Sequence, residues 1–227
     1  MWPIILKQLV SLGFALIFGT AICCKLRRFY TLIFFQVVLA FIFIVITIWL
    51  NFHFGIEYNN QWIFNYYIVA ETCILALAGL KHSELSWQNP LKIFIVGGFC
   101  IFMLAWVLQI YSSGIYVLAN RACIVESVFL AILFFIFLYR STFDYRGPML
   151  GNPDAWLCVG CIIYFGCSIP ILGLLHFLSK ADEHLLKKLF NIIRILSNIR
   201  YLFTGISFVL LLRQHNNSEK KKQNEYN

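Results

Sequence analysis

Charged residues are scarce in this 227-residue sequence. Asp, Glu, Lys and Arg make up 12% of it, whereas 61% is apolar and 18% aromatic. Soluble domains carry about 25% charged residues, so this composition, with a mean hydropathy of +0.79, excludes an ordinary soluble domain. A membrane-spanning helix needs about 20 apolar residues, and six or seven of them would use most of the chain. The sequence therefore predicts a polytopic membrane protein that leaves no room for a soluble catalytic domain.

The sequence also lacks the motifs of enzyme and pigment chemistry. It contains no H-E-x-x-H zinc site, no G-x-S-x-G nucleophile elbow, no glycine-rich phosphate loop and no pair of intramembrane aspartates. The last apolar segment has arginines but no lysine beyond Lys188, which excludes a retinal Schiff base of the opsin type. We therefore expect neither an enzyme nor a cofactor-dependent protein.

The eight cysteines all fall inside apolar segments, so a disulfide framework is not expected. Cys158 and Cys161 have the spacing of a redox or metal site. They have no second cysteine pair and no histidine nearby, and small residues at a contact between membrane helices explain them better.

Seven apolar segments are each long enough to cross a bilayer. They cover residues 2–24, 29–52, 62–80, 93–111, 115–138, 155–178 and 189–212. Only Ser112-Ser113-Gly114 separates the fourth from the fifth, so the alternative is a fifth helix that starts later, near Arg121. The sequence predicts an all-α domain of seven transmembrane helices over residues 1–213, followed by a disordered polar tail over residues 214–227.

Lysines and arginines between the spans indicate the orientation, because positive residues in short loops stay on the cytoplasmic side. One side would hold Lys25, Arg27, Arg28, Lys81, Lys92, Arg140, Arg146, Arg213, Lys220, Lys221 and Lys222, and the other Lys7, Lys180, Lys187 and Lys188. We therefore expect the N-terminus outside and the C-terminus inside a cytoplasmic membrane. The net charge of +8 is then mainly a topology signal, and no nucleic-acid partner is expected.

Several ionisable side chains fall inside the expected spans, where each costs about 3 kcal/mol or more and is a functional candidate by default. At a rise of about 1.5 Å per residue, Glu71, Glu126 and Arg200 lie roughly 14 to 17 Å below the outer ends of their spans, close to the midplane. Arg121 and Arg194 lie in the outer half. We expect both glutamates to flank Arg200 beneath an outward-opening, net-positive vestibule.

Further polar residues extend this candidate site. On the last span Arg194, Asn198 and Tyr201 share one helical face, and Tyr67 precedes Glu71 by one turn. Lys7 is an additional candidate at the vestibule. The predicted ligand-binding residues are Tyr67, Glu71, Arg121, Glu126, Arg194, Asn198 and Arg200. The alternative is an internal ion-pair network that only fixes the register of the helices.

Short motifs give the chain a resemblance to known proteins. A glutamate lies in each of the third and fifth spans, Asn152-Pro153-Asp154-Ala155-Trp156 opens the sixth, Tyr164-Phe165-Gly166 lies within it, and the asparagine-rich seventh ends near Phe208. In this pattern the chain resembles an uncharacterised family of small bacterial seven-helix integral membrane proteins. In architecture it is also similar to the seven-helix sensory modules of histidine kinases, but without their kinase domain.

Two functions are consistent with these observations. The topology, the outer cationic residues and Pro170, which is expected to loosen the sixth helix, favour a sensor or receptor-like protein. It would bind a small ligand from outside, an anionic one by preference, and signal through a cytoplasmic or membrane partner. The alternative is a small secondary transporter in which Glu71 and Glu126 bind protons or cations.

Overall fold

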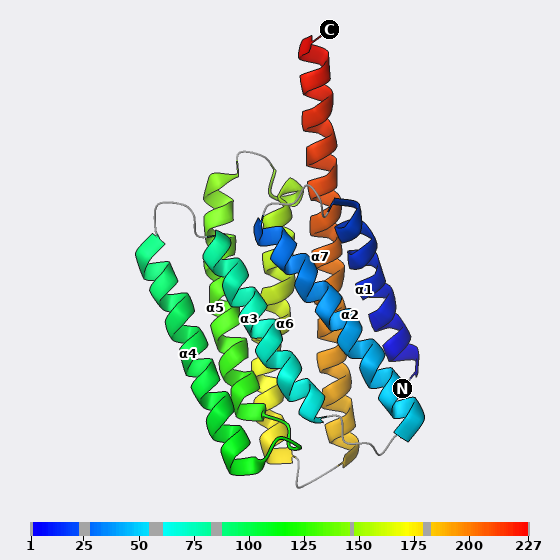
Figure 1. Ribbon diagram of the computed structural model, residues 1–227, viewed down its shortest axis with the longest axis vertical. Coiled ribbons are helices and arrows are strands. Elements are labelled where there is room, and N and C mark those ends of the chain that lie inside the picture. Colours follow the sequence, from blue (N-terminus) through cyan, green and yellow to red (C-terminus); the bar gives the residue numbers. More distant parts are fainter. Residues whose placement is uncertain are drawn as a thin grey trace.

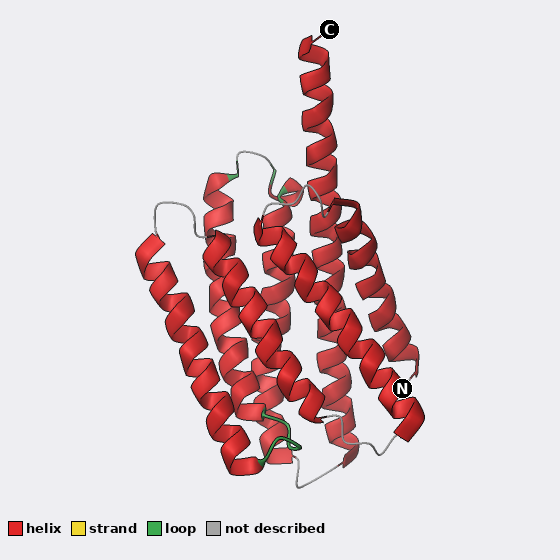
Figure 2. Ribbon diagram, viewed as in Figure 1, coloured by secondary structure: helices red, strands yellow, loops and turns green. Residues whose placement is uncertain are grey.

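The computed structural model describes residues 2–22, 28–54, 61–82, 88–145, 148–178 and 183–226. These residues form seven long helices and one short 3-10 helix, with no strand among them. The elements are α1 (Trp2–Ile22), α2 (Arg28–Phe54), α3 (Gln61–His82), α4 (Gln88–Ser113), α5 (Asn120–Asp144), η2 (Met149–Gly151), α6 (Pro153–Leu178) and α7 (Glu183–Tyr226). The long helices lie side by side in one bundle (Figures 1 and 2).

Six of these helices, α2 to α7, are long and apolar enough to cross a membrane. In α1 the apolar stretch over Lys7–Ile22 is shorter. Length and composition thus confirm the expected all-helical, multi-pass membrane architecture, and the seventh span stays a prediction. Some residues used to predict the orientation, in 23–27, 146–147 and 179–182, lie outside the described residues.

The seven helices form a closed ring. Each helix contacts the next one in the chain, and α1 closes the ring against α7. The start of α1 and the projecting end of α7 lie at opposite ends of the bundle, here called the N-end and the C-end (Figure 1). Gly205 allows α1 to approach α7 closely, since a Cβ there would lie 2.2 Å from the Phe14 ring. Small residues at such contacts are typical of membrane helix packing.

The half of the bundle toward the C-end has a dry aromatic core. Phe134 and Phe137 of α5, Phe165 of α6 and Phe208 of α7 are at most 1% exposed. Phe134 stacks on Phe165 with ring centroids 6.4 Å apart. The buried charged side chains Glu71, Glu126 and Arg200 lie outside this aromatic core, in the middle of the bundle.

The fifth helix starts later than the apolar pattern indicates. It begins at Asn120, as in the alternative with a late start, and residues 114–119 form the connection from α4. Gly114 has a φ of +79° there, a left-handed conformation that glycine adopts without steric cost.

Asn65 of α3 fixes this connection to the bundle. Its Nδ2 donates to the carbonyl oxygens of Ile115 and Val117, each at 2.8 Å, and its Oδ1 accepts from the Ala119 N–H at 2.9 Å. Asn65 is fully buried. Its amide group therefore hydrogen-bonds three backbone groups that would otherwise need water as a partner.

The C-terminal segment differs from the disordered tail that we expected. Helix α7 is continuous over 44 residues to Tyr226 and projects beyond the bundle (Figure 1). The segment after Gly205 contains no glycine or proline and is rich in Lys, Glu and Gln, which are good helix formers. His215 also pairs with Glu219 at 2.9 Å across one turn, so the packed part of α7 is extended by a locally stabilised helix.

Replacing Asn65 by leucine should destabilise the protein. The Asn65→Leu side chain keeps a similar volume but leaves the buried Ala119 N–H unpaired, and such a group costs about 1–3 kcal/mol. We expect a lower midpoint of thermal unfolding in detergent, followed by tryptophan fluorescence. Asn216→Leu, at an exposed position of α7, is the control, and an equal midpoint for the two variants would contradict the role of Asn65.

Candidate functional site

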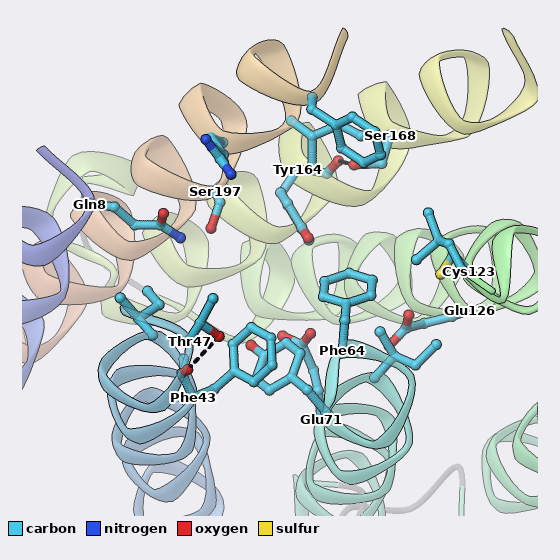
Figure 3. Close-up of a pocket in the computed structure, with 18 of the residues that line it drawn as sticks. Gln8, Phe43, Thr47, Phe64, Glu71, Cys123, Glu126, Tyr164, Ser168 and Ser197 are labelled. Atoms are coloured by element: carbon cyan, nitrogen blue, oxygen red, sulfur yellow. Dashed lines mark hydrogen bonds between the residues drawn. The ribbon is translucent and has the colours of Figure 1, made fainter. Parts of the chain in front are cut away.

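A cavity of about 580 Å³ lies inside the ring of helices (Figure 3). This volume falls within the range of about 300–1,000 Å³ that is typical of small-molecule sites. Its polar lining residues are Gln8, Thr47, Asn51, Gln61, Tyr67, Glu71, Glu126, Ser127, Tyr164, Ser168, Arg194, Ser197 and Tyr201. Phe43, Phe64, Phe165 and Phe190 add aromatic walls.

The cavity extends from the N-end to the middle of the bundle. Its lining includes Gln8 near the start of α1, Asn51 near the end of α2 and the exposed Gln61 at the start of α3. Glu71 and Glu126 lie in the middle of their helices and form the floor. The dry aromatic core lies beyond this floor, so the cavity does not continue to the C-end.

A buried ion pair between α3 and α7 forms part of the floor. The Arg200 guanidinium donates to Oε1 of Glu71, and both side chains are only 3% exposed. The Nε2 of Gln36 on α2 donates to the same oxygen at 2.8 Å. The negative charge of Glu71 is therefore compensated by a cation and a neutral donor from two other helices.

Aromatic rings surround the other face of Arg200. Its guanidinium carbon lies 4.8 Å from the ring centroid of Tyr164 and 5.1 Å from those of Phe165 and Tyr201. Such cation–π contacts strengthen when the cation is removed from water. The Tyr201 hydroxyl also lies 3.2 Å from that of Tyr67, so the network connects α7 to α3 a second time.

Glu126 is the other acid of the floor. It is 4% exposed, and its Oε1 forms a short hydrogen bond with Oγ1 of Thr72. We expected Glu126 to flank Arg200 together with Glu71. Among the described residues, however, Glu126 has no ion pair, and Arg200 pairs with Glu71.

Arg194 is the cation nearest the mouth of the cavity. It lies on α7 six residues before Arg200, about 9 Å closer to the N-end, and is half-buried in the cavity lining. No ion pair or hydrogen bond joins its guanidinium to another side chain of the described segments. A positive charge is thus presented to the cavity without a paired carboxylate in the part of the chain that the structure describes.

Three candidates lie outside the cavity. Arg121 is exposed in the first turn of α5, and Lys7 is exposed on α1. Arg121 precedes Glu126 by five residues, about 140° around the helix, so it faces outward when the glutamate faces inward. Asn198 does not line the cavity, and its Oδ1 accepts from Ser11 of α1 at 3.5 Å. The structure therefore brings together Tyr67, Glu71, Glu126, Arg194 and Arg200 of the predicted set.

Sequence reasoning missed Gln36 and Thr72, which contact the two glutamates. Gln36 is the one polar side chain in the apolar run Ile33-Phe34-Phe35-Gln36-Val37-Val38. A single amide side chain in such an apolar run could have indicated a buried polar contact. Thr72 offers none, because threonines commonly bond their own helix, as this one does to the Ile68 carbonyl at 2.7 Å.

Breaking the buried ion pair should destabilise the protein strongly. Arg200→Met leaves Glu71 buried without its cation, and such losses cost about 3–5 kcal/mol. Glu71→Gln combined with Arg200→Met should cost less than the sum of the two single changes, because no charge is left unpaired. Unfolding in mixed micelles measures each free energy.

Arg121→Met is the control for this series, since it removes an arginine from an exposed position of α5 and should change stability by about 0.5 kcal/mol or less. Additive single and double effects would show that Glu71 and Arg200 do not depend on each other.

Compared with protein families, with curated proteins and with solved structures, the chain matches none of them. The resemblance to a bacterial seven-helix family therefore stays a prediction. The function has to be argued from the cavity and its charges.

Proposed function

We propose that this is a sensor or receptor-like protein of a cell membrane that binds a small ligand in the cavity from the outside. The ligand carries an anionic group that pairs with Arg194. The observation that carries this proposal is a half-buried guanidinium that lines a cavity of about 580 Å³ and has no anionic partner in the described residues.

The charge of Arg194 is well placed for this role. A guanidinium removed from part of its water gains most from a carboxylate or phosphate, which it binds through two parallel hydrogen bonds. Gln8 and Ser197 line the cavity as well (Figure 3) and would supply neutral donors to the same group. The deeper Arg200 is already occupied by Glu71, so it is not the anion site.

The walls favour a ligand with an apolar body. Phe43 stacks on Tyr67 with ring centroids 4.5 Å apart, and Phe64 lies 6.0 Å from Phe43. All three rings line the cavity, and Figure 3 shows Phe43 and Phe64 beside Glu71 of the polar floor. A flat or aliphatic body would bury apolar surface there, and each buried CH₂ group contributes about 0.8 kcal/mol.

Helix α7 offers a route from the cavity to a partner. It carries Arg194 and Arg200 in the cavity region and projects from the C-end as one continuous helix (Figure 1). Pro170 interrupts the backbone hydrogen bonds of α6, against which α7 packs. A ligand that pulls on Arg194 would shift α7, and the projecting segment would present that shift to a cytoplasmic or membrane partner.

The expected orientation places the mouth of the cavity outside. Near the C-end lie Arg28, Lys81, Lys92, Arg140, Arg213 and, on the projecting part of α7, Lys220, Lys221 and Lys222; near the N-end lie Lys7, Arg121, Lys187 and Lys188. This asymmetry supports seven spans with the N-terminus outside and the C-terminus inside.

A reporter experiment tests the orientation. Green fluorescent protein fused to the C-terminus should fluoresce, and alkaline phosphatase fused there should be inactive because it stays in the cytoplasm. Phosphatase fused after Ser113, between α4 and α5, should be active. The reverse pattern at both positions would place the mouth of the cavity inside.

Ligand binding should depend on Arg194 and not on Arg121. We expect small carboxylates with an apolar body to raise the thermal midpoint of the wild type, and Arg194→Gln to weaken their affinity at least about tenfold. Binding to the purified protein in detergent is measured by thermal shift and calorimetry.

Arg121→Gln removes the same charge from an exposed position near the same end, so it should bind like the wild type. Equal weakening by Arg121→Gln would mean that the net charge and not the cavity attracts the ligand. If no anion stabilises the wild type over Arg194→Gln, the proposal is refuted.

The second candidate is a small secondary transporter coupled to protons or cations through Glu71 and Glu126. The observation in its favour is that Glu126 lines the cavity without a cation partner among the described residues. The dry core toward the C-end would then have to open during each cycle. Accumulation of a bound ligand in proteoliposomes under an imposed pH gradient separates the candidates, since a receptor moves no ligand.

A further inference from the structure

We infer that the ligand is amphoteric: besides its anionic group it carries a protonated amine, which pairs with Glu126 and displaces a proton that this residue holds in the empty cavity. The inference rests on the proposed function, because it assigns the second half of the same ligand.

The single hydroxyl group of Thr72 contacts two oxygen atoms. Its Oγ1 lies 2.7 Å from the carbonyl oxygen of Ile68 and in short hydrogen-bond contact with Oε1 of Glu126. A hydroxyl carries only one hydrogen, so it can donate to both oxygens only by sharing that hydrogen. If Thr72 instead donates to Ile68 alone, as helical threonines do, the hydrogen toward Glu126 belongs to the carboxyl group, and Glu126 is a neutral carboxylic acid.

The carboxyl group of Glu126 is accessible from the cavity. Its Oε1 is bound to Thr72, and Oε2 has no hydrogen-bond partner among the described residues. Oε2 is nevertheless not among the fully enclosed polar atoms without a partner in the described part, such as Oδ1 of Asn120 and Oγ of Ser207. Because Glu126 lines the cavity, this oxygen faces the empty volume, and Figure 3 shows its side chain at that space.

Glu126 has no cation paired with it among the described residues. The titratable groups that line the cavity or its floor are Tyr67 and Glu71 from α3, Cys123 from α5, Tyr164 from α6, and Arg194, Arg200 and Tyr201 from α7. Helix α4 contributes none, since its Lys92, Cys100 and Tyr111 are exposed. Glu71 and Arg200 cancel each other, so an ionised Glu126 would be a buried charge without a pair. A proton removes that cost in the empty cavity.

A ligand ammonium can take the place of this proton. On binding, the O–H bond of Glu126 breaks and the proton leaves through the mouth of the cavity to the aqueous phase. The ligand nitrogen then donates an N–H bond to the carboxylate that remains. The ligand brings one cation to the floor as one proton departs, so the net charge there does not change, and no redox partner is required.

The spacing of the two groups indicates an extended ligand. Arg194 lies about 9 Å above the level of Arg200 and Glu71 by helical rise, and Glu126 is joined to Thr72, the neighbour of Glu71. An α-amino acid holds its charges much closer together than this. An ω-amino acid, with an aliphatic chain between carboxylate and amine, fits the two charges and the aromatic wall together.

Three probes of matched chain length test the inference: 6-aminohexanoate, hexanoate without the amine, and hexylamine without the carboxylate. We expect the wild-type protein in detergent to bind 6-aminohexanoate at least about tenfold more tightly than either other probe. Calorimetry in buffers of different ionisation enthalpy should show release of about one proton for each 6-aminohexanoate bound. Hexanoate should release none.

Glu126→Gln is the decisive variant, because the amide can still donate to Thr72 but cannot ionise. It should lose the proton release and the preference for 6-aminohexanoate, and should bind hexanoate like the wild type. An infrared band of a protonated carboxylic acid should be present in the ligand-free wild type and absent from Glu126→Gln. Arg121→Gln should retain every wild-type property.

The possible failures are distinct. If hexanoate binds through Arg194 as tightly as 6-aminohexanoate and no proton is released, the amine inference is overturned while the proposed function stands. An infrared spectrum without an acid band that depends on Glu126 also overturns it, whatever binds. If none of the three probes nor any anion binds, the proposed function fails with it.

Discussion

The Glu71–Arg200 ion pair is the constraint on which the middle of this bundle depends. A charge in the hydrocarbon region is costly, so neither residue is tolerated there without the other. The ring of helices runs in chain order, and α3 and α7 do not follow each other in it. The pair therefore reaches across the interior of the ring, with Gln36 from α2 as a third contact. It holds the floor of the cavity in place.

The two halves of the interior have different roles because of this floor. Toward the C-end, buried phenylalanines from α5, α6 and α7 pack together. Toward the N-end, the side chains are polar or loosely packed and enclose about 580 Å³. Asn65 fixes the connection after α4, which contributes Leu118 to the cavity wall. The wall with Leu118, the paired floor and Arg194, which has no anionic partner among the described residues, border the same cavity.

Much of the fold could be predicted from apolar segments, since a 20-residue apolar run has few alternatives to a membrane helix. The start of α5 was less certain, because Ile115 to Ala119 are apolar enough to continue a span. Only Asn65, 50 residues earlier in the chain, shows why they form a connection instead. The segment after Arg213 was expected to be disordered from its polarity, but polarity does not distinguish an exposed helix from a coil.

The sequence by itself determined the helical class and the apolar segments that are long enough to cross a membrane, and it gave the positions of Glu71, Glu126, Arg194 and Arg200 along those segments. The sequence also explains why Arg121 faces away from Glu126, because residues five positions apart point in very different directions around one helix. Only the tertiary structure decided which glutamate pairs with Arg200, and that Thr72 contacts the other. Helical periodicity gives the face that a side chain occupies, whereas its partner depends on which helix packs against that face and at what height.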